Sequence, residues 1–270
     1  MPDLKLAIAG LGAIGLKVAQ AVDAGGIAGL TLVAVAARDG DKARRNLAGF
    51  RHQPPLVPLV DLAGVADVVV ECLPSSVFAQ VALPAIQAGR IFMPLSVGAL
   101  LDHMHLVDLA KTTGARIIVP TGALVGLDAV RAVAEGSIET VSITTRKPPA
   151  GLAGAPLLAA KGISVGNLKV PLLVFEGSAR EAIKGLPANV NVAVALALAG
   201  IGPDRTRVFI WADPGVVRNT HTIEVVSDTS NFTMTIAGLP SVETPATGRV
   251  VPLSVIAALR RLTAPLVVGS

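Results

Sequence analysis

The chain of 270 residues is predicted to be an α/β protein with two domains. The first is a doubly wound parallel sheet covered by helices, and the second is a smaller α/β domain with a mostly antiparallel sheet. Three observations predict this: a glycine-rich turn after the first apolar run, an alternation of strand-like and helix-like segments up to Thr121, and a change to half-buried strand patterns beyond it. We expect domains at residues 1–121 and 122–245, with residues 246–270 returning to the first domain as a helix.

The first elements form a βαβ unit. An apolar strand at residues 4–9 runs into Gly10-Leu-Gly12-Ala-Ile-Gly15, a helical pattern follows as far as Val22, and residues 30–37 form a second strand. This length suits a right-handed crossover between parallel strands.

The alternation then continues through the first domain. We expect a helix at 41–48, a strand at 65–73, a helix capped by Ser75 or Ser76 and ending at Ala88, a strand at 91–97, a helix at 100–112 and a strand at 116–120.

The second domain has strands separated by turn signals. We expect strands at 138–146, 170–175, 207–212, 220–226 and 232–237, a helix with a capping box at Ser178 and Glu181, a helix that begins after Pro187 and Asn189 and ends at Ala199, and a final helix at 254–262.

Composition excludes several classes of protein. Hydrophobic residues make up 52% of the chain, but they lie in short runs, and residues 192–201 are far shorter than the ~20 residues that cross a bilayer. The start of the chain lacks the pattern of a signal peptide, so we expect a cytoplasmic protein without membrane contact. The net charge of +4 comes from scattered residues and there is no Tyr, which argues against nucleic acid as a partner. Cys72 is the only cysteine, so we expect neither a disulfide nor a metal site.

The glycine spacing carries the clearest chemical signal. Glycines at 10, 12 and 15 permit a tight turn, approach of the backbone to a pyrophosphate, and close contact of helix and strand. An incidental glycine-rich turn is the alternative, but the setting inside a βαβ unit favours the dinucleotide site of a Rossmann domain. We therefore expect these residues to bind the cofactor: Gly10, Gly12, Ala13, Ile14 and Gly15.

The end of the second strand bears on the choice between NAD and NADP. NAD-specific enzymes place an acidic residue there to bind the ribose 2′-hydroxyl. This chain has Ala37 and Arg38 at that point, and Asp39 comes slightly late. The small and cationic side chains leave room and charge for a 2′-phosphate, so we expect both cofactors to be used; a solvated Arg38 without this role is the alternative.

A second loop at the same edge follows the third strand. Cys72, Leu73 and Pro74 lie where ligands bind in doubly wound sheets, so we expect them at the cofactor. A helix N-cap is the alternative reading of this segment. A role for Cys72 as a nucleophile is the weaker idea, because a lone cysteine among apolar residues is usually a buried hydrophobe.

Among the four histidines, His221 is the candidate for catalysis. It lies on a strand of the second domain, where an imidazole could act as acid or base at neutral pH. Asn219, beside it in the chain, or a backbone carbonyl is expected to fix the tautomer of its ring. A structural histidine is the alternative. His103 and His105, two apart on one expected helix, should point to different sides and therefore not pair on a metal.

Six segments in order resemble the L-aspartate dehydrogenase family over nearly the whole chain. They are the glycine turn, Thr121–Asp128, Thr145–Pro149, Phe175–Arg180, Pro187–Val192, and Asp213-Pro214 followed by Asn219–Ile223. The resemblance implies a homodimer, cofactor contacts from Ala123 and Asn189, and His221 as the catalytic residue. It also implies reversible oxidation of L-aspartate to iminoaspartate, which hydrolyses to oxaloacetate and ammonia and can also feed pyridine nucleotide biosynthesis.

Two departures from the family pattern stand out. The family commonly has an acidic residue near Ala37, and a segment like Asn-Pro-Lys-Thr is replaced here by Thr244-Pro-Ala-Thr247. For the substrate carboxylates the sequence offers Arg146, Lys147 and Arg218 without ranking them. Two other functions remain open: a dehydrogenase or reductase for another small oxo or amino acid, such as the dihydrodipicolinate or homoserine type, and a regulator that binds NAD(P)H without catalysis.

Overall fold

The computed structural model describes residues 3–186, 190–241 and 247–269. The chain divides into two compact units. Unit 1 comprises Met1–Pro120 with Val251–Val267, and unit 2 comprises Thr121–Val250 with Val268–Ser270. The final helix therefore belongs to unit 1, although it lies far along the chain from the other elements of that unit.

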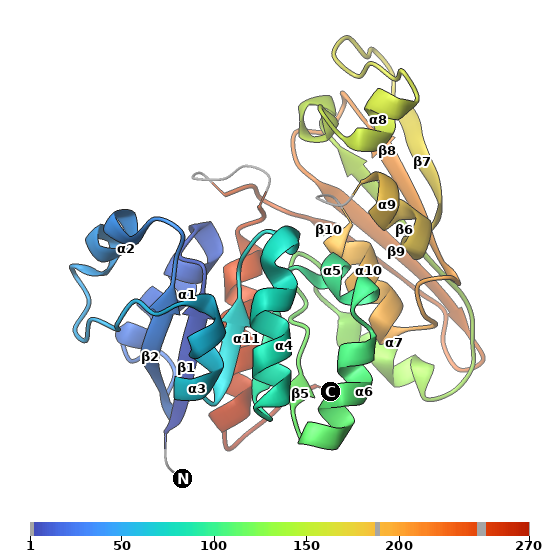
Figure 1. The fold of residues 1–270 in the computed structure, drawn as a ribbon. Coiled ribbons are helices and arrows are strands. Elements are labelled where there is room, and N and C mark those ends of the chain that lie inside the picture. Colours follow the sequence, from blue (N-terminus) through green and yellow to red (C-terminus); the bar gives the residue numbers. More distant parts are fainter. Residues whose placement is uncertain (1–2, 187–189, 242–246, 270) are drawn as a thin grey trace. The chain divides into compact units, whose positions relative to one another are not determined.

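Unit 1 is built on a five-stranded sheet in the order β2-β1-β3-β4-β5, in which every pairing is parallel (Figure 1). The strands are β1 (Leu4–Ala9), β2 (Leu30–Ala36), β3 (Val68–Glu71), β4 (Ile91–Pro94) and β5 (Arg116–Ile117). The helices are α1 (Ala13–Asp23), α2 (Gly40–Leu47), α3 (Leu62–Val65), α4 (Phe78–Gln87), α5 (Val97–Asp102), α6 (His105–Thr113) and α11 (Val250–Thr263), with 3-10 turns at η1 (Leu59–Asp61) and η2 (Ser75–Val77). This is the predicted doubly wound fold.

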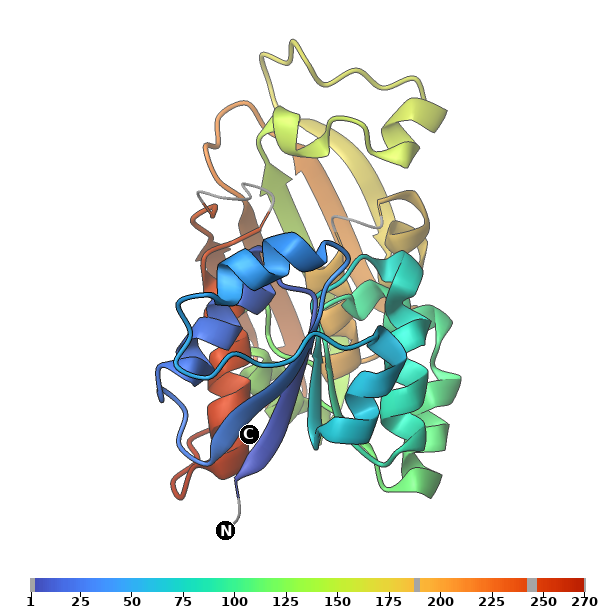
Figure 2. The same cartoon turned by 60° about the vertical axis from the view of Figure 1, so that its left-hand side comes forward.

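The hydrophobic core of unit 1 joins the two ends of the chain. Val18 of α1 and Val255 and Leu259 of α11 belong to the same buried cluster as Leu6 and Ile8 of β1. Helices α1 and α11 therefore cover one face of the sheet (Figure 2), and α3 and α4 pack on the other. Coverage on both faces explains why the strands read as continuous apolar runs.

Two local predictions in unit 1 are wrong. Ser75 and Ser76 do not cap α4, because they lie inside the 3-10 turn η2 and the cap position falls on Val77. The single helix expected at 100–112 is two helices, α5 and α6, with a break after Asp102.

The prediction that His103 and His105 point to different sides of one helix is also wrong. Their rings lie 5.9 Å apart between centroids, because the two residues do not share one continuous helix. The His103 Nδ1 atom lies 2.9 Å from the Ala99 carbonyl oxygen. Among the described residues, no group of His, Cys, Asp or Glu is arranged to hold a metal ion.

Unit 2 is built on a mixed sheet in the order β10-β9-β6-β8-β7. Only β6 and β8 pair in parallel, so the sheet is mostly antiparallel, as predicted. The strands are β6 (Ile138–Lys147), β7 (Leu172–Ser178), β8 (Thr206–Ala212), β9 (Thr220–Ser227) and β10 (Phe232–Ala237). The helices are α7 (Leu127–Ala134), α8 (Pro156–Ala160), α9 (Ala179–Gly185) and α10 (Asn191–Ala199), with a 3-10 turn η3 (Pro149–Leu152).

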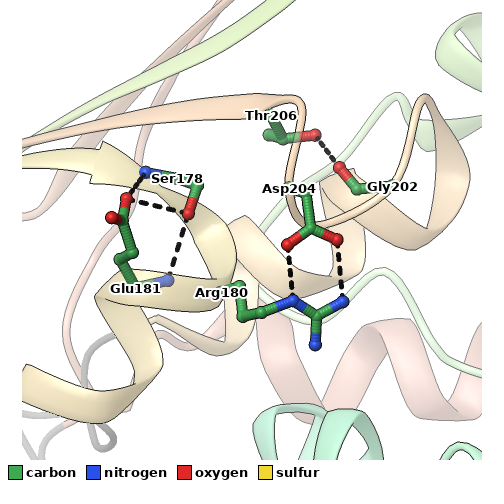
Figure 3. A network of polar contacts seen from close by, with 6 residues as sticks. All are labelled: Ser178, Arg180, Glu181, Gly202, Asp204 and Thr206. Atoms are coloured by element: carbon green, nitrogen blue, oxygen red, sulfur yellow. Dashed lines mark hydrogen bonds and ion pairs between the residues drawn. The ribbon is translucent and has the colours of Figure 1, made fainter.

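The capping box predicted at the start of α9 is confirmed. Glu181 accepts hydrogen bonds from the Ser178 backbone N–H (2.7 Å) and hydroxyl (2.9 Å), as Figure 3 shows. In the same view Arg180 binds both carboxylate oxygens of Asp204, which links α9 to the turn before β8. These groups are exposed, so the ion pair contributes at most about 1 kcal/mol.

One face of the unit 2 sheet is covered by helices. Along β6 the residues Val141, Ile143, Thr145 and Lys147 are all buried, while the residues between them are more exposed. Gly200, after α10, lies against Val130 of α7 and against Val141, so these two helices cover that face. Within the described ranges, none of the helices has the length and apolar character to cross a bilayer.

Candidate active site

The three glycines of the first turn have three different surroundings. Gly10 has φ of 100°, and a Cβ there would lie 2.6 Å from the Cys72 carbonyl oxygen. A Cβ on Gly15 would lie 1.9 Å from the Gly10 carbonyl oxygen, so helix α1 could not approach the turn so closely. A Cβ on Gly12 would meet nothing within 4 Å. Gly10 and Gly15 are therefore required by the fold, and Gly12 leaves open space above the turn.

The start of α1 is suited to an anion. Gly12 is the N-cap and offers no side-chain acceptor, and the first turn has no acidic residue. Ala13 and Ile14 begin the helix at this point. Backbone N–H groups at a helix N-terminus bind phosphate, and the open space at Gly12 lets a pyrophosphate approach. The residues present fit a dinucleotide.

The Cys72–Pro74 loop lies against the same turn. The Cys72 N–H donates to the Ala9 carbonyl oxygen (2.8 Å), and its own carbonyl is the group nearest to Gly10. Desolvation raises the pKa of the Cys72 thiol, and the negative charge of Glu71 raises it further. A thiol of raised pKa forms little thiolate, so the nucleophile alternative has no support.

Sequence reasoning missed Glu71, the last residue of β3. Its carboxylate is fully buried and accepts hydrogen bonds from the Leu73 N–H (2.7 Å), the Ser96 N–H (3.0 Å), the Ser96 hydroxyl (3.0 Å) and the Leu95 N–H (3.2 Å). Burial raises its pKa, while these donors pull in the opposite direction. Glu71 thus ties two loops together at the carboxyl edge of the sheet. The signal in the sequence was an acidic residue ending the apolar run Val68-Val-Val.

The segment after β2 carries one acidic and one cationic side chain near the expected cofactor site. Asp39 is the N-cap of α2, and its carboxylate accepts from the Lys42 N–H (2.9 Å). Arg38 is exposed at the same edge as the glycine turn, since Ala36 pairs with Ala9. The acidic group is therefore engaged in a helix cap, whereas the cation is open to solvent.

Of the two cofactor contacts expected in unit 2, Ala123 belongs to the described residues. Ala123 lies in the turn before α7 and is half-buried. Asn189 lies outside the described residues.

His221 occupies a buried corner of unit 2. It is 4% exposed and pairs across the sheet with Thr145, whose hydroxyl oxygen lies 3.0 Å from the His221 Nδ1 atom. Asn219 and a backbone carbonyl were the partners that the sequence suggested for the ring, but the Nδ1 partner is Thr145. Burial, and then the positive charge of Lys147, lowers the pKa of His221 to about 4. The imidazole is therefore neutral at pH 7.

The three candidate cations have distinct environments. Arg146 donates to Asp213 (2.8 Å), and its guanidinium lies 5.0 Å from the centroid of the Trp211 ring. Arg218 is exposed in the segment between β8 and β9. Lys147 is only 7% exposed, and burial lowers its pKa to about 8.

Comparison with known proteins shows the family. Residues 10–120 match the family model of the NAD binding domain of homoserine dehydrogenase, and residues 128–262 match that of the C-terminal domain of aspartate dehydrogenase. An L-aspartate dehydrogenase of Bradyrhizobium diazoefficiens is 54% identical over 268 residues, which cover 99% of this chain and 95% of the relative. The chain belongs to the L-aspartate dehydrogenase family.

Other relatives agree with this assignment. L-aspartate dehydrogenase 3 of Bordetella bronchiseptica is 51% identical, over 99% of this chain and 98% of its own length. Among solved structures, the aspartate dehydrogenase of Thermotoga maritima has a TM-score of 0.75 at 24% identity, covering 99% of this chain and 100% of the other. At 24% identity, the similarity to this solved structure shows the fold alone. In the present chain, unit 1 contains the NAD-binding domain.

Proposed function

We propose that the chain catalyses the NAD(P)-dependent, reversible oxidative deamination of L-aspartate. The similarity over 99% of the chain to relatives named L-aspartate dehydrogenase carries this proposal. The open turn at Gly12, which fits a pyrophosphate, supports the requirement for a dinucleotide.

The reaction needs a hydride acceptor and proton transfers. A bound nicotinamide would supply the acceptor for the hydride of L-aspartate Cα, and hydrolysis of the resulting imine by water would give oxaloacetate and ammonia. The backbone of Gly12, Ala13 and Ile14 would bind and orient the cofactor phosphates. His221, held through Nδ1 by Thr145, presents Nε2 for proton transfer to or from the amine and the attacking water.

The first experiment measures NAD(P)H absorbance with purified protein. Oxaloacetate plus ammonium is offered in one direction and L-aspartate in the other, each with NAD and NADP in turn. Turnover with these substrates and not with other small oxo or amino acids supports the proposal. Cofactor binding without turnover would favour a different substrate or a regulator that binds NAD(P)H without catalysis.

Replacement of His221 by Ala tests the catalytic assignment. We expect kcat to fall about 100-fold or more, because a positioned acid or base contributes this much. His105→Ala, an exposed histidine of unit 1, is the matched control and should keep wild-type kcat. Near wild-type turnover by the His221 variant would contradict the assignment.

Use of both cofactors is part of the proposal. Arg38 supports it as an exposed cation at the carboxyl edge of the sheet, where a 2′-phosphate would lie. An Arg38→Ala variant should lose affinity for NADP and retain affinity for NAD. Equal loss of both would contradict a role in 2′-phosphate binding.

We also propose a cytoplasmic homodimer. The face of the unit 2 sheet opposite to His221 carries the half-buried rings of Phe209 and Trp211, which suits contact with a second copy. Light scattering coupled to gel filtration gives the mass in solution, and a monomeric mass would contradict the dimer. The cytoplasmic location is supported by the single cysteine, because proteins of a reducing compartment rarely contain disulfides.

A further inference from the structure

Glu71 ends β3 in the middle of the unit 1 sheet. It pairs on one side with Ala9, the residue before the glycine turn, and on the other with Pro94, the last residue of β4. Its side chain is fully buried, although glutamate is among the residues least often buried without partners. Hydrogen bonds to both carboxylate oxygens therefore have to offset the cost of removing the group from water.

The two oxygens of Glu71 contact two different loops. Oε1 accepts from the Leu73 N–H (2.7 Å), in the loop that follows β3. Oε2 accepts from the Ser96 N–H (3.0 Å) and the Leu95 N–H (3.2 Å), in the loop that follows β4. One side chain thus holds the backbone of both loops at the carboxyl edge of the sheet.

The side chain of Ser96 strengthens this connection. Ser96 is the N-cap of α5, where a serine hydroxyl ordinarily accepts a bond from the first turn, but within the described part of the chain its hydroxyl contacts other groups. Its Oγ atom lies 2.6 Å from the Leu73 carbonyl oxygen and 3.0 Å from Glu71 Oε1. The N–H and the C=O of Leu73 are therefore both held by side chains, those of Glu71 and Ser96.

The loop held in this way touches the glycine turn. A Cβ on Gly10 would lie 2.9 Å from the Leu73 Cδ2 atom and 2.6 Å from the Cys72 carbonyl oxygen. A displacement of Leu73 would therefore alter the surface beside the turn that fits a pyrophosphate.

The strand order indicates which half of a dinucleotide would meet the two loops. In a doubly wound sheet the pyrophosphate lies at the turn after the first strand, and the adenosine ribose lies at the end of the second. In the order β2-β1-β3-β4 the other half would extend over the ends of β3 and β4. Neighbouring strands are about 4.8 Å apart, so the two loops begin about 5 and 10 Å from the turn.

We propose that Glu71 is a positioning residue for the cofactor, which holds the loops after β3 and β4 in the arrangement that receives the nicotinamide half. The inference rests on the NAD(P) requirement of the proposed function. Glu71 acts through Leu73 and Ser96, without touching the cofactor. A carboxylate that only stabilised the sheet would affect the whole dinucleotide site, whereas a positioning residue at this place affects one half of it.

Glu71→Gln tests this role, because glutamine has the same shape but replaces one acceptor oxygen by an N–H donor. A loop N–H then faces a second donor, and its loop should shift. We expect the Kd of NADH, measured by fluorescence titration, to rise about tenfold. The Kd of ADP, which carries adenosine and two phosphates but no nicotinamide, should not change in calorimetry.

Ile86→Ala is the matched control for lost stability. Ile86 is fully buried near the C-terminal end of α4, where this helix has returned from the carboxyl edge of the sheet toward the start of β4. The cavity should lower the urea midpoint at least as much as Glu71→Gln does and leave the Kd of NADH unchanged. An equal rise in the Kd of NADH for both variants would mean that lost stability suffices, which overturns the inference.

The two ligands separate the remaining outcomes. Equal weakening of NADH and ADP by Glu71→Gln overturns the inference, and so does wild-type affinity for NADH; both leave the proposed function intact, because turnover of L-aspartate tests it. Failure of the wild type to bind NADH would instead refute the cofactor requirement, and the inference with it.

Ser96→Ala decides if Glu71→Gln does not fold. It removes only the hydroxyl that contacts Leu73 and Glu71, so the Kd of NADH should rise about threefold and that of ADP should stay the same. An unchanged Kd of NADH in this variant overturns the inference.

Discussion

The candidate sites of the two units are built from different groups, backbone atoms in unit 1 and side chains in unit 2. In unit 1 the site consists of backbone: a turn at Gly10, open space at Gly12 and the N-terminus of α1. In unit 2 it consists of buried side chains, with Thr145, Lys147 and His221 on one face of a mixed sheet. A backbone site depends on the absence of side chains, whereas a side-chain site depends on strand register.

This contrast predicts how each site fails. Substitutions in the glycine turn should separate stability from cofactor binding, because each glycine has its own reason to lack a Cβ. Substitutions around His221 should change chemistry and pH dependence with little effect on the cofactor.

Gly15→Ala should have the largest effect on the fold. A Cβ 1.9 Å from the Gly10 carbonyl oxygen forces α1 away from the turn, so we expect a loss of about 3 kcal/mol in the free energy of unfolding. Cofactor affinity should fall with it. Urea unfolding and NADH titration measure both. Gly64→Ala, a helical glycine with nothing within 4 Å of its Cβ position, is the control and should be as stable as the wild type.

The buried imidazole of His221 should make the protein sensitive to acid. Its pKa is about 4 in the folded chain, below its ordinary value of 6.5, so protons bind the unfolded chain more tightly. The stability it contributes is complete above pH 6.5 and is lost as the pH falls toward about 4.

Comparison with His221→Gln isolates this contribution. Between pH 7 and pH 5 the wild type should lose about 2 kcal/mol more than the variant in urea unfolding. Parallel pH profiles for the two proteins would contradict the lowered pKa.

Gly12→Ala should weaken the cofactor and spare the fold. The added methyl group meets no protein atom, so the free energy of unfolding should change by less than about 0.5 kcal/mol. It occupies the space that a pyrophosphate needs, so the Kd of NADH should rise at least about tenfold. An unchanged Kd would show that the phosphates lie elsewhere.

Thr145→Val should have the smallest effect. The variant keeps the shape and removes the hydroxyl that contacts His221 Nδ1, a hydrogen bond of about 1 kcal/mol, so kcat should fall about fivefold. Thr144→Val, on the opposite face and paired with Thr222, is the matched control. Equal kinetics for the two variants would mean that Thr145 does not orient the ring.

The sequence predicted the sheet of unit 1 well and its loops less well. Apolar runs and glycine spacing are local signals, and they placed β1, α1 and β2 correctly. The cap at Ser75 and the unbroken helix through His103 were wrong, because a serine after proline can enter a 3-10 turn and a helix can break without glycine or proline. Glu71 was missed, because most of its donors belong to Leu95 and Ser96, which lie 24 and 25 residues away in the chain.

The sequence by itself determined the order of the strands along the chain, the glycine turn and the family, since each depends on residues close together in the chain. The tertiary structure decided which residue contacts the His221 ring, and which of Arg146 and Lys147 shares its face. Those facts depend on the register between β6 and β9, which are separated by more than seventy residues between Thr145 and His221. Register fixes the partner of every side chain across a sheet, and β6 and β9 are not joined by a hairpin turn that would specify it locally.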